Sequence, residues 1–220
     1  MPRFPKLCAY CGSKQPTTRD HVIPQCLFIP PYPPNLLTVP SCRPCNLAKS
    51  RDDTFLRDFL AVDIASHQHP VAAALFDRKV RRSVARNSSE VAKLAVGRRR
   101  MTSLYTAAGV YVGDFPGMEI PGDRVGIMVR RLVRGLYFNS RRRLFPADHS
   151  LKVLRHPAGV FQDLYSRLTI RSKPPATYVL GTVFGCAFIY TDEPFHTIWL
   201  LWFFERVVFS AVSTDPEASN

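Results

Sequence analysis

Apolar residues recur at helical spacing through much of the first half of this 220-residue chain. From Asn46 to about His69, apolar residues three and four positions apart predict an amphipathic helix. The same spacing predicts a second helix over Val71–Arg86. The segment Asn87–Glu90 offers residues that cap a third helix, which reaches the basic cluster Arg98–Arg100.

The second half of the chain combines one helical segment with extended ones. Helical spacing predicts a helix over Asp123–Phe138, preceded by a strand at Val110–Val112 and a turn at Pro121-Gly122. Aromatic and β-branched residues predict further extended segments at Ser150–Leu154, Leu168–Arg171, Thr177–Tyr190 and Trp199–Val212. We therefore expect an α+β fold with an antiparallel sheet in the C-terminal part.

The first 50 residues differ from the rest because they are rich in Cys, Pro and turn residues. They contain too few apolar residues for a core of their own, so this section needs a cross-link or a metal to hold it together. We expect three parts: a module over residues 1–66, a basic helical connector over 67–108, and an α+β domain of unknown role over 109–220.

Positive charge is concentrated in the middle of the chain. The 30 Lys and Arg exceed the 17 Asp and Glu, for a net charge of +13, and residues 70–156 alone carry +12 of it. A solvated helical face explains scattered basic residues, but such a local excess favours an anionic partner, nucleic acid before an anionic membrane surface. We expect Arg51, Arg98, Arg99 and Arg100 to contact nucleic acid.

The two longest apolar stretches do not fit membrane spans. Ala176–Tyr190 contains two glycines and is short for a bilayer, and Thr197–Val212 is interrupted by Glu205-Arg206. No apolar signal segment follows Met1. The sequence therefore predicts a cytoplasmic protein without a membrane partner, in which the cysteines are reduced.

Two Cys-x-x-Cys pairs, Cys8 with Cys11 and Cys42 with Cys45, stand 30 residues apart. Four thiolates in this pattern close a tetrahedral structural Zn²⁺ site, which would supply folding energy that the local core lacks. Disulfides are disfavoured by the expected compartment, and a redox Cys-x-x-Cys motif would occur once rather than twice. The pairs predict structural zinc, with a further element inserted between them.

The inserted segment contains Asp20-His21-Val22-Ile23-Pro24 and then Asn35-Leu36, and the second cysteine pair continues into Asn46-Leu47-Ala48-Lys49. In order, spacing and residue type, residues 8–53 resemble the HNH nuclease family in its zinc-knuckle form. The Asp-His and Asn-x-x-Lys segments are also similar to the HNH domain of RNA-guided CRISPR nucleases. The last letter of the motif is Asn46 rather than histidine, so the chain resembles an HNN variant.

The resemblance implies a ββα-metal unit with a role for each motif residue. His21 would be the general base that activates a water molecule. Asp20 and Asn46 would bind one divalent cation, Mg²⁺ or Mn²⁺, through oxygen atoms. Asn35 would brace the loop that orients His21, and Lys49 would face a phosphate.

Each residue also has an ordinary interpretation. Taken alone, Asp20 could be a turn residue, His21 a surface histidine, Asn46 a helix cap and Lys49 a solvated side chain. Outside the motif, the remaining cysteines, Cys26 and Cys186, are expected to be a spare thiol and a small buried residue. The aromatic run Trp199, Trp202, Phe203 and Phe204 is expected in the core rather than as a base-stacking platform.

The sequence thus favours a metal-dependent endonuclease that cleaves DNA, with RNA not excluded as a substrate. The alternative is a zinc-knuckle nucleic-acid-binding protein that does not cleave. The near-neutral, aromatic-rich C-terminal part fits a core or the surface of a homodimer.

Overall fold

The computed structural model describes residues 6–86, 89–97, 99–106, 108–120, 123–146, 149–157, 159–170, 174–191 and 196–214. Helices and antiparallel sheets are both present, which confirms the predicted α+β class. Among the described residues, no helix is long and apolar enough to cross a membrane.

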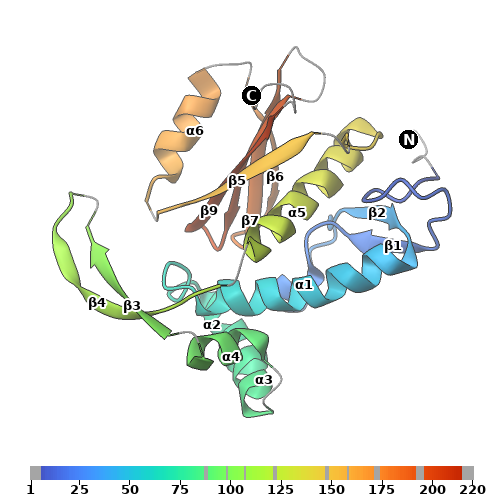
Figure 1. The fold of residues 1–220 in the computed structure, drawn as a ribbon. Coiled ribbons are helices and arrows are strands. Elements are labelled where there is room, and N and C mark those ends of the chain that lie inside the picture. The colour runs from blue at the N-terminus through green and yellow to red at the C-terminus, as the bar shows by residue number, and fades with distance from the viewer. Residues whose placement is uncertain are drawn as a thin grey trace.

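The N-terminal part is a short hairpin followed by a long helix (Figure 1). Strand β1 (Thr18–His21) pairs antiparallel with β2 (Thr38–Ser41), and a 3₁₀ turn, η1 (Gln25–Leu27), lies in the connection. Helix α1 (Arg43–Val62) follows β2 directly, with Cys42 as its N-cap and a proline in its first turn. The helix therefore begins three residues before the predicted start at Asn46, so Asn46 is not its cap.

The middle part is helical, as the apolar spacing predicted. Helix α2 (Pro70–Leu75), the π-helical segment η2 (Phe76–Val80) and α3 (Arg81–Ala85) succeed one another without a break. Ser89 then caps α4 (Glu90–Gly97), because its Oγ accepts a hydrogen bond from the amide of Ala92 at 3.2 Å. Asn87 and Ser88 of the predicted cap lie outside the described residues.

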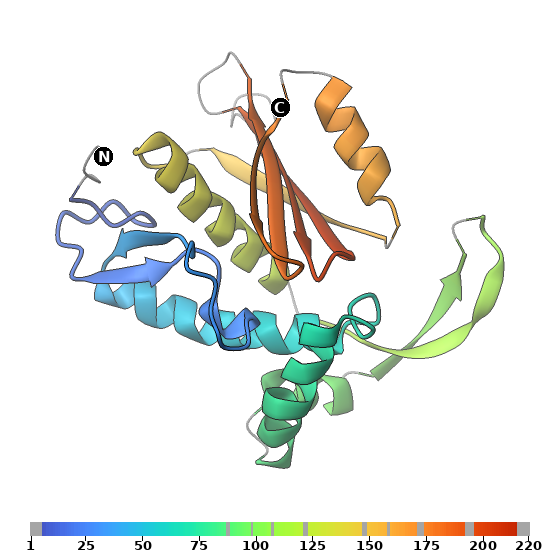
Figure 2. The same cartoon turned by 180° about the vertical axis from the view of Figure 1, so that it is seen from behind.

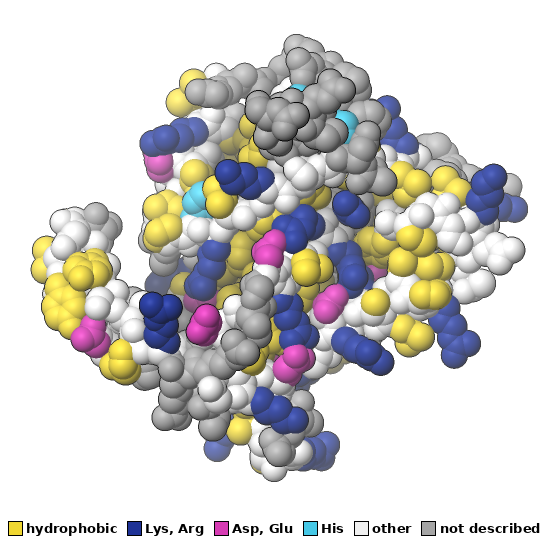
Figure 3. All heavy atoms as spheres, viewed as in Figure 1, with side chains coloured by type: hydrophobic (Ala, Val, Ile, Leu, Met, Phe, Trp, Pro, Cys, Tyr) yellow, Lys and Arg dark blue, Asp and Glu magenta, His cyan; other side chains and the backbone are white. Residues whose placement is uncertain are grey.

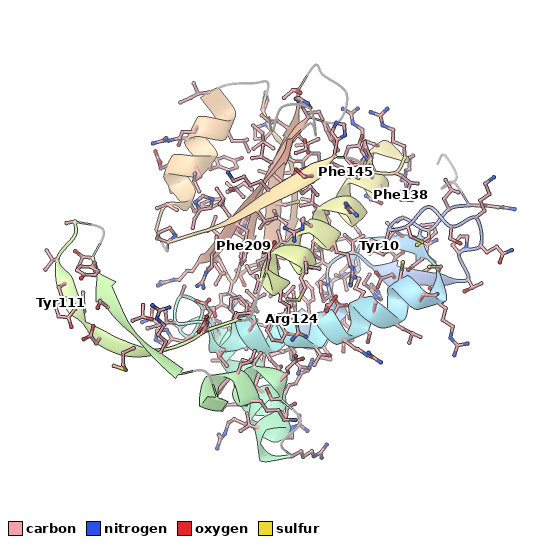
Figure 4. All side chains as sticks on the ribbon, viewed as in Figure 1. Tyr10, Tyr111, Arg124, Phe138, Phe145 and Phe209 are labelled. Atoms are coloured by element: carbon pink, nitrogen blue, oxygen red, sulfur yellow. The ribbon has the colours of Figure 1, made fainter. Side chains whose placement is uncertain are left out.

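A β-hairpin projects from the body of the molecule after α4 (Figures 1 and 2). It consists of β3 (Arg99–Tyr105) and β4 (Tyr111–Met118), which pair antiparallel. The sequence predicted only part of β4, and it indicated a basic cluster rather than a strand at the first residues of β3. Its exposed apolar side chains include Met101, Tyr105 and Tyr111, the last of which is labelled in Figure 4.

A five-stranded antiparallel sheet, in the order β5-β9-β8-β7-β6, forms the C-terminal part. Its strands are β5 (Ser150–His156), β6 (Ala176–Leu180), β7 (Phe184–Tyr190), β8 (Thr197–Phe203) and β9 (Val207–Thr214). Helix α5 (Arg124–Arg141) packs on one face and α6 (Phe161–Ile170) on the other. The expectation of an extended segment at Leu168–Arg171 is wrong up to Ile170, because α6 buries Leu168 against the sheet. The predicted turn at Pro121-Gly122 lies outside the described residues.

One cluster of buried side chains runs from Ala9 in the N-terminal loop to Ala211 in β9. Helix α5 joins the two ends of the chain within this cluster, and Phe138, Phe145 and Phe209 mark its position in Figure 4. The predicted core position of Trp199, Phe203 and Phe204 is confirmed, since all three are fully buried, and Trp202 is half-buried against α6.

Candidate functional site

Four cysteine thiols meet where the N-terminal loop approaches the start of α1. The Sγ atoms of Cys8, Cys11, Cys42 and Cys45 lie within 4.8 Å of one another. The first pair sits on a tight turn, in which the amide of Gly12 donates a hydrogen bond of 2.9 Å to the carbonyl of Cys8. Gly12 has a φ of +74°, a conformation that favours glycine. The predicted cluster is therefore present, although its cysteines are far apart in sequence.

The environment of these thiols fits a metal ion. Burial of the Cys8 thiol acts to raise its pKa, but backbone amides, that of Cys42 foremost, outweigh this effect and lower the pKa from 9.0 to about 7. Burial and then the neighbouring thiols raise the pKa of Cys45. A metal ion would favour thiolates at all four positions, and four sulfur donors are the set that structural zinc takes in proteins. The four cysteines could therefore hold a zinc ion.

Cys26 and Cys186 take no part in this cluster. Cys26 donates to the carbonyl of Asp53 at 3.3 Å, and burial raises its pKa to about 11. Burial raises the pKa of Cys186, which lies in the sheet, to about 12. Both thiols are therefore protonated near neutral pH, in keeping with the spare thiol and the small buried residue that the sequence predicts.

Asp20 lies on the face of β1 that packs against α1. Its side chain is 8% exposed. The hydroxyl of Tyr10 donates a hydrogen bond of 2.6 Å to Oδ2 of Asp20, and Nζ of Lys49 lies 3.6 Å from Oδ1. Because alternate residues of a strand share a face, Thr18 also faces α1, whereas Arg19 and His21 face the opposite side.

Lys49 points into the module, whereas the sequence predicted that it would face a phosphate. It is 1% exposed, and its ammonium donates to both carboxylate oxygens of Asp53, at 3.0 and 2.8 Å, and to the carbonyl of His21 at 2.8 Å. Together with the contact to Asp20, these bonds occupy the ammonium fully. Lys49 therefore ties α1 to β1 from inside the module.

Tyr10 and Asp53 complete this network, and neither residue was predicted from the sequence to take part in the site. Burial, then the charge of Asp20, raises the pKa of Tyr10 well above its usual value, so the phenol stays a donor. Burial raises the pKa of Asp53 from 3.8 to about 6, even though Lys49 opposes the shift. The spacing of four residues between Lys49 and Asp53 was a usable signal, since such residues are neighbours on a helix.

Asn46 lies one helical turn before Lys49 and also faces β1. Its side-chain amide donates to Oγ1 of Thr18 at 3.1 Å. Among the described residues no donor reaches the side-chain oxygen of Asn46, so this oxygen is available to a ligand. Beside it lies a hollow of about 500 Å³, lined by Thr17, Thr18, Arg43, Asn46, Leu47 and Ser50. Asp20 on β1 and Asn46 on α1 thus both lie where the strand packs against the helix.

His21 ends β1 and is half-buried. Its backbone is fixed, because it pairs with Thr38 of β2 and its carbonyl accepts the bond from Lys49. No hydrogen bond of its imidazole is found among the described residues. Asn35 is exposed, and the hydrogen bond found for it joins its backbone carbonyl to the hydroxyl of Tyr178 at 2.8 Å. No hydrogen bond among the described residues joins Asn35 to His21, so the bracing role of Asn35 stays a prediction.

The basic residues that are expected to contact nucleic acid lie in two regions. Arg51 is exposed on α1, and Lys and Arg side chains are spread across the face that carries α1 and α5 (Figure 3). Arg100 is exposed on β3, Arg99 belongs to the same strand, and Arg98 lies outside the described residues.

No protein-family model, curated protein or solved structure matches the chain. The assignment of a function therefore rests on the geometry and chemistry of this site.

Proposed function

We propose that the chain is a metal-dependent endonuclease of the HNH type, which hydrolyses phosphodiester bonds in DNA. One observation carries the proposal. Two strands and a helix follow one another in the order β1-β2-α1, four cysteines gather at the start of the helix, and Asn46 bonds back to the strand that contains Asp20 and His21. This is the arrangement of elements that the resemblance to the HNH family implies.

In this proposal His21 is the general base. Its imidazole takes a proton from the attacking water, whose oxygen bonds to phosphorus while the bond to the 3′ oxygen breaks. The 3′ oxygen leaves as a hydroxyl after protonation by solvent, and the phosphate stays on the 5′ end. The pairing with Thr38 and the bond from Lys49 hold the backbone of His21, while no bond among the described residues engages the imidazole.

The donor chemistry of Asp20 and Asn46 fits a hard divalent cation such as Mg²⁺ or Mn²⁺. A carboxylate oxygen and an amide oxygen are suitable ligands, and such sites complete their coordination with water and substrate oxygens. A bound cation would neutralise charge on the scissile phosphate and on the departing oxygen. Tyr10 holds Oδ2 of Asp20, so an ion would bind at Oδ1, beside the ammonium of Lys49.

One observation favours the alternative, a zinc-knuckle protein that binds nucleic acid without cleaving it. The ammonium of Lys49 lies 3.6 Å from Oδ1 of Asp20. A fixed positive charge at this distance competes with a divalent cation for the carboxylate. In this alternative, Lys49 replaces the catalytic ion and the module serves only as a scaffold.

A plasmid-nicking assay separates the two. Zinc-loaded protein is incubated with supercoiled DNA alone, with Mg²⁺ and with Mn²⁺. The proposal predicts nicking that requires the added cation and that Asn46→Ala abolishes. Asn46 is only half-buried, so this variant is expected to fold, and Thr54→Ala, at an exposed position further along α1 and outside the hollow, is its control. If the wild type binds DNA but nicks no form of it with either metal, the binding-only alternative replaces the proposal.

A further inference from the structure

A second hollow lies between the later part of α1 and the segment η2–α3. Its volume is about 230 Å³. Five basic side chains and one serine line it: Arg57, Arg78, Lys79, Arg82, Ser83 and Arg86. No carboxylate is among the lining residues, so the walls of the hollow carry an excess of positive charge.

The basic groups are held in place by neighbouring atoms. Arg57 is nearly buried and is fixed by two hydrogen bonds to Asp58. Lys79 donates to the carbonyl of Cys26 at 3.2 Å, and Arg82 donates to the carbonyl of Arg78. These contacts orient the cations and leave most of their charge unbalanced.

The nearest acidic groups neutralise Arg57 and leave the other four cations of the hollow without a carboxylate partner among the described residues. Asp58 forms an ion pair with Arg57 and accepts a hydrogen bond from Ser89. Asp77 forms an ion pair on the surface with Arg81, which does not line the hollow. Burial, and the charges of Arg57 and Arg82, lower the pKa of Lys79. These effects disfavour the protonated form of Lys79, and a bound anion would favour it.

We propose that this hollow is a phosphate-binding site. Several guanidinium groups around a concave surface suit the tetrahedral oxygens of a phosphate, which accept charge-assisted hydrogen bonds from more than one side. Ser83 adds a hydroxyl to the lining. The choice of ligand rests on the proposed nuclease function. The ligand is a backbone phosphate of the DNA strand that is bound at the catalytic module.

The position of the hollow on α1 supports this ligand. Arg57 follows Asn46 by eleven residues, which is close to three full turns, so the two residues share one side of the helix. The rise of the helix separates them by about 16 Å. About five base-pair steps of a duplex cover that distance along its axis. A strand positioned at Asn46 can therefore reach the second hollow along the same side of α1.

A free phosphate or mononucleotide would present the same chemistry as a DNA phosphate. Two probes distinguish these sources. A short DNA duplex, without Mg²⁺ or Mn²⁺, reports on the backbone phosphate by fluorescence anisotropy across about 50 to 200 mM salt. Inorganic phosphate and a nucleoside 5′-monophosphate report on the free ligand by calorimetry.

The test variant is Arg78→Gln/Arg82→Gln, which removes two exposed cations of the hollow and leaves buried Arg57 intact. The control is Arg81→Gln/Arg167→Gln, which removes the same charge from two exposed arginines outside it. The slope of log affinity against log salt should become shallower by about one for the test variant, the loss of one phosphate contact. The control should keep the wild-type slope.

Three outcomes decide the matter. A change of slope confined to the test variant supports a backbone phosphate. Saturable binding of phosphate or mononucleotide that only the test variant loses, with duplex affinity unchanged, supports the site with a free ligand. If test and control variants behave alike with every probe, the site is refuted. Because the assay uses no catalytic metal, that result leaves nicking by the wild type, and hence the proposed function, standing.

Discussion

Replacement of Lys49 by methionine tests the packing that holds the catalytic strand. The ammonium of Lys49 lies 2.8 Å from Asp53 and 3.6 Å from Asp20, and the residue is 1% exposed. Methionine matches the lysine side chain as far as Cε but leaves two buried carboxylates without the ammonium that lies between them. Removal of one partner of a buried ion pair costs about 3–5 kcal/mol. We expect Lys49→Met to lower the free energy of unfolding by about that amount at pH 8.

The pH dependence of this loss gives a second test. Burial raises the pKa of Asp53 from 3.8 to about 6, a shift equivalent to about 3 kcal/mol in favour of the protonated form. Because the folded pKa is above the unfolded one, the associated stability is fully present below 3.8 and is lost as the pH rises through about 6. Without Lys49, which lowers this pKa, the folded value rises further. The deficit of Lys49→Met should therefore be smaller at pH 5 than at pH 8.

Urea unfolding of zinc-loaded protein at pH 5, 6, 7 and 8 measures both effects. Lys93→Met, an exposed lysine on α4, is the control and should unfold like the wild type at each pH. Subtraction of the wild-type curve removes the pH dependence of zinc binding, which the variants share. If Lys49→Met lowers the free energy of unfolding by less than about 1 kcal/mol at pH 8, Lys49 contributes no more than a surface ion pair does, and the buried network is contradicted. A loss that stays constant down to pH 5 would refute the role of Asp53.

Three further substitutions probe the metal cluster, a helix cap and a close helix contact. Cys45→Ser removes one of the four thiols, so the protein should lose its zinc, measured by atomic absorption, and the N-terminal module should lose protection from proteolysis. Ser89→Ala removes the cap of α4 and a hydrogen bond to Asp58, which should cost about 1–2 kcal/mol in urea unfolding. Gly135→Leu should cost about 1–3 kcal/mol or more, because even a Cβ there would lie 2.8 Å from Cγ1 of Val22.

Each of these variants has a matched control. Cys26→Ser should keep the full zinc content, since this thiol lies outside the cluster. Ser166→Ala, on the exposed side of α6, should leave the unfolding midpoint unchanged. Gly97→Leu places a side chain where no atom lies within 4 Å of the Cβ, so it should be tolerated. Equal zinc content in Cys45→Ser and Cys26→Ser would contradict the metal cluster.

The parts of the fold that were predicted correctly depend on local spacing. The apolar spacing of α5 and of the helices over Pro70–Gly97 is set by the packing of single helices, so the sequence carries it directly. The cysteine cluster was predictable for a different reason. The first Cys-x-x-Cys pair lies on a tight turn and the second at the start of α1, and metal binding needs both pairs together.

The role of Lys49 could not be read from the sequence, because its burial depends on residues distant along the chain. Tyr10 and the strand of Asp20 enclose one side of the network, and Arg131 of α5 pairs with Asp52 beside it at 2.6 Å. A lysine on a helix is ordinarily solvated. Only the folded structure shows that Lys49 is almost completely shielded from solvent.

Two errors of secondary structure have local causes. Helix α6 was missed although Phe161, Leu164, Tyr165 and Leu168 have helical spacing, because the prediction started too late in the segment. Strand β3 was missed because its first residues are arginines. Its partner β4 lies directly after it in the chain, and pairing between the two defines the strand more than the residues of either one do.

The measurement that tests the central claim most directly is the rate at which His21→Ala nicks supercoiled plasmid in the presence of Mg²⁺. His21 is half-buried and no described bond engages its imidazole, so the variant should fold and retain zinc. His67→Ala, which removes an exposed histidine outside β1, β2 and α1, is the matched control. If His21 is the general base, its variant nicks about 10²–10⁴-fold more slowly than the wild type, whereas the control does not. A His21→Ala protein that nicks as fast as the wild type would contradict the proposed active site.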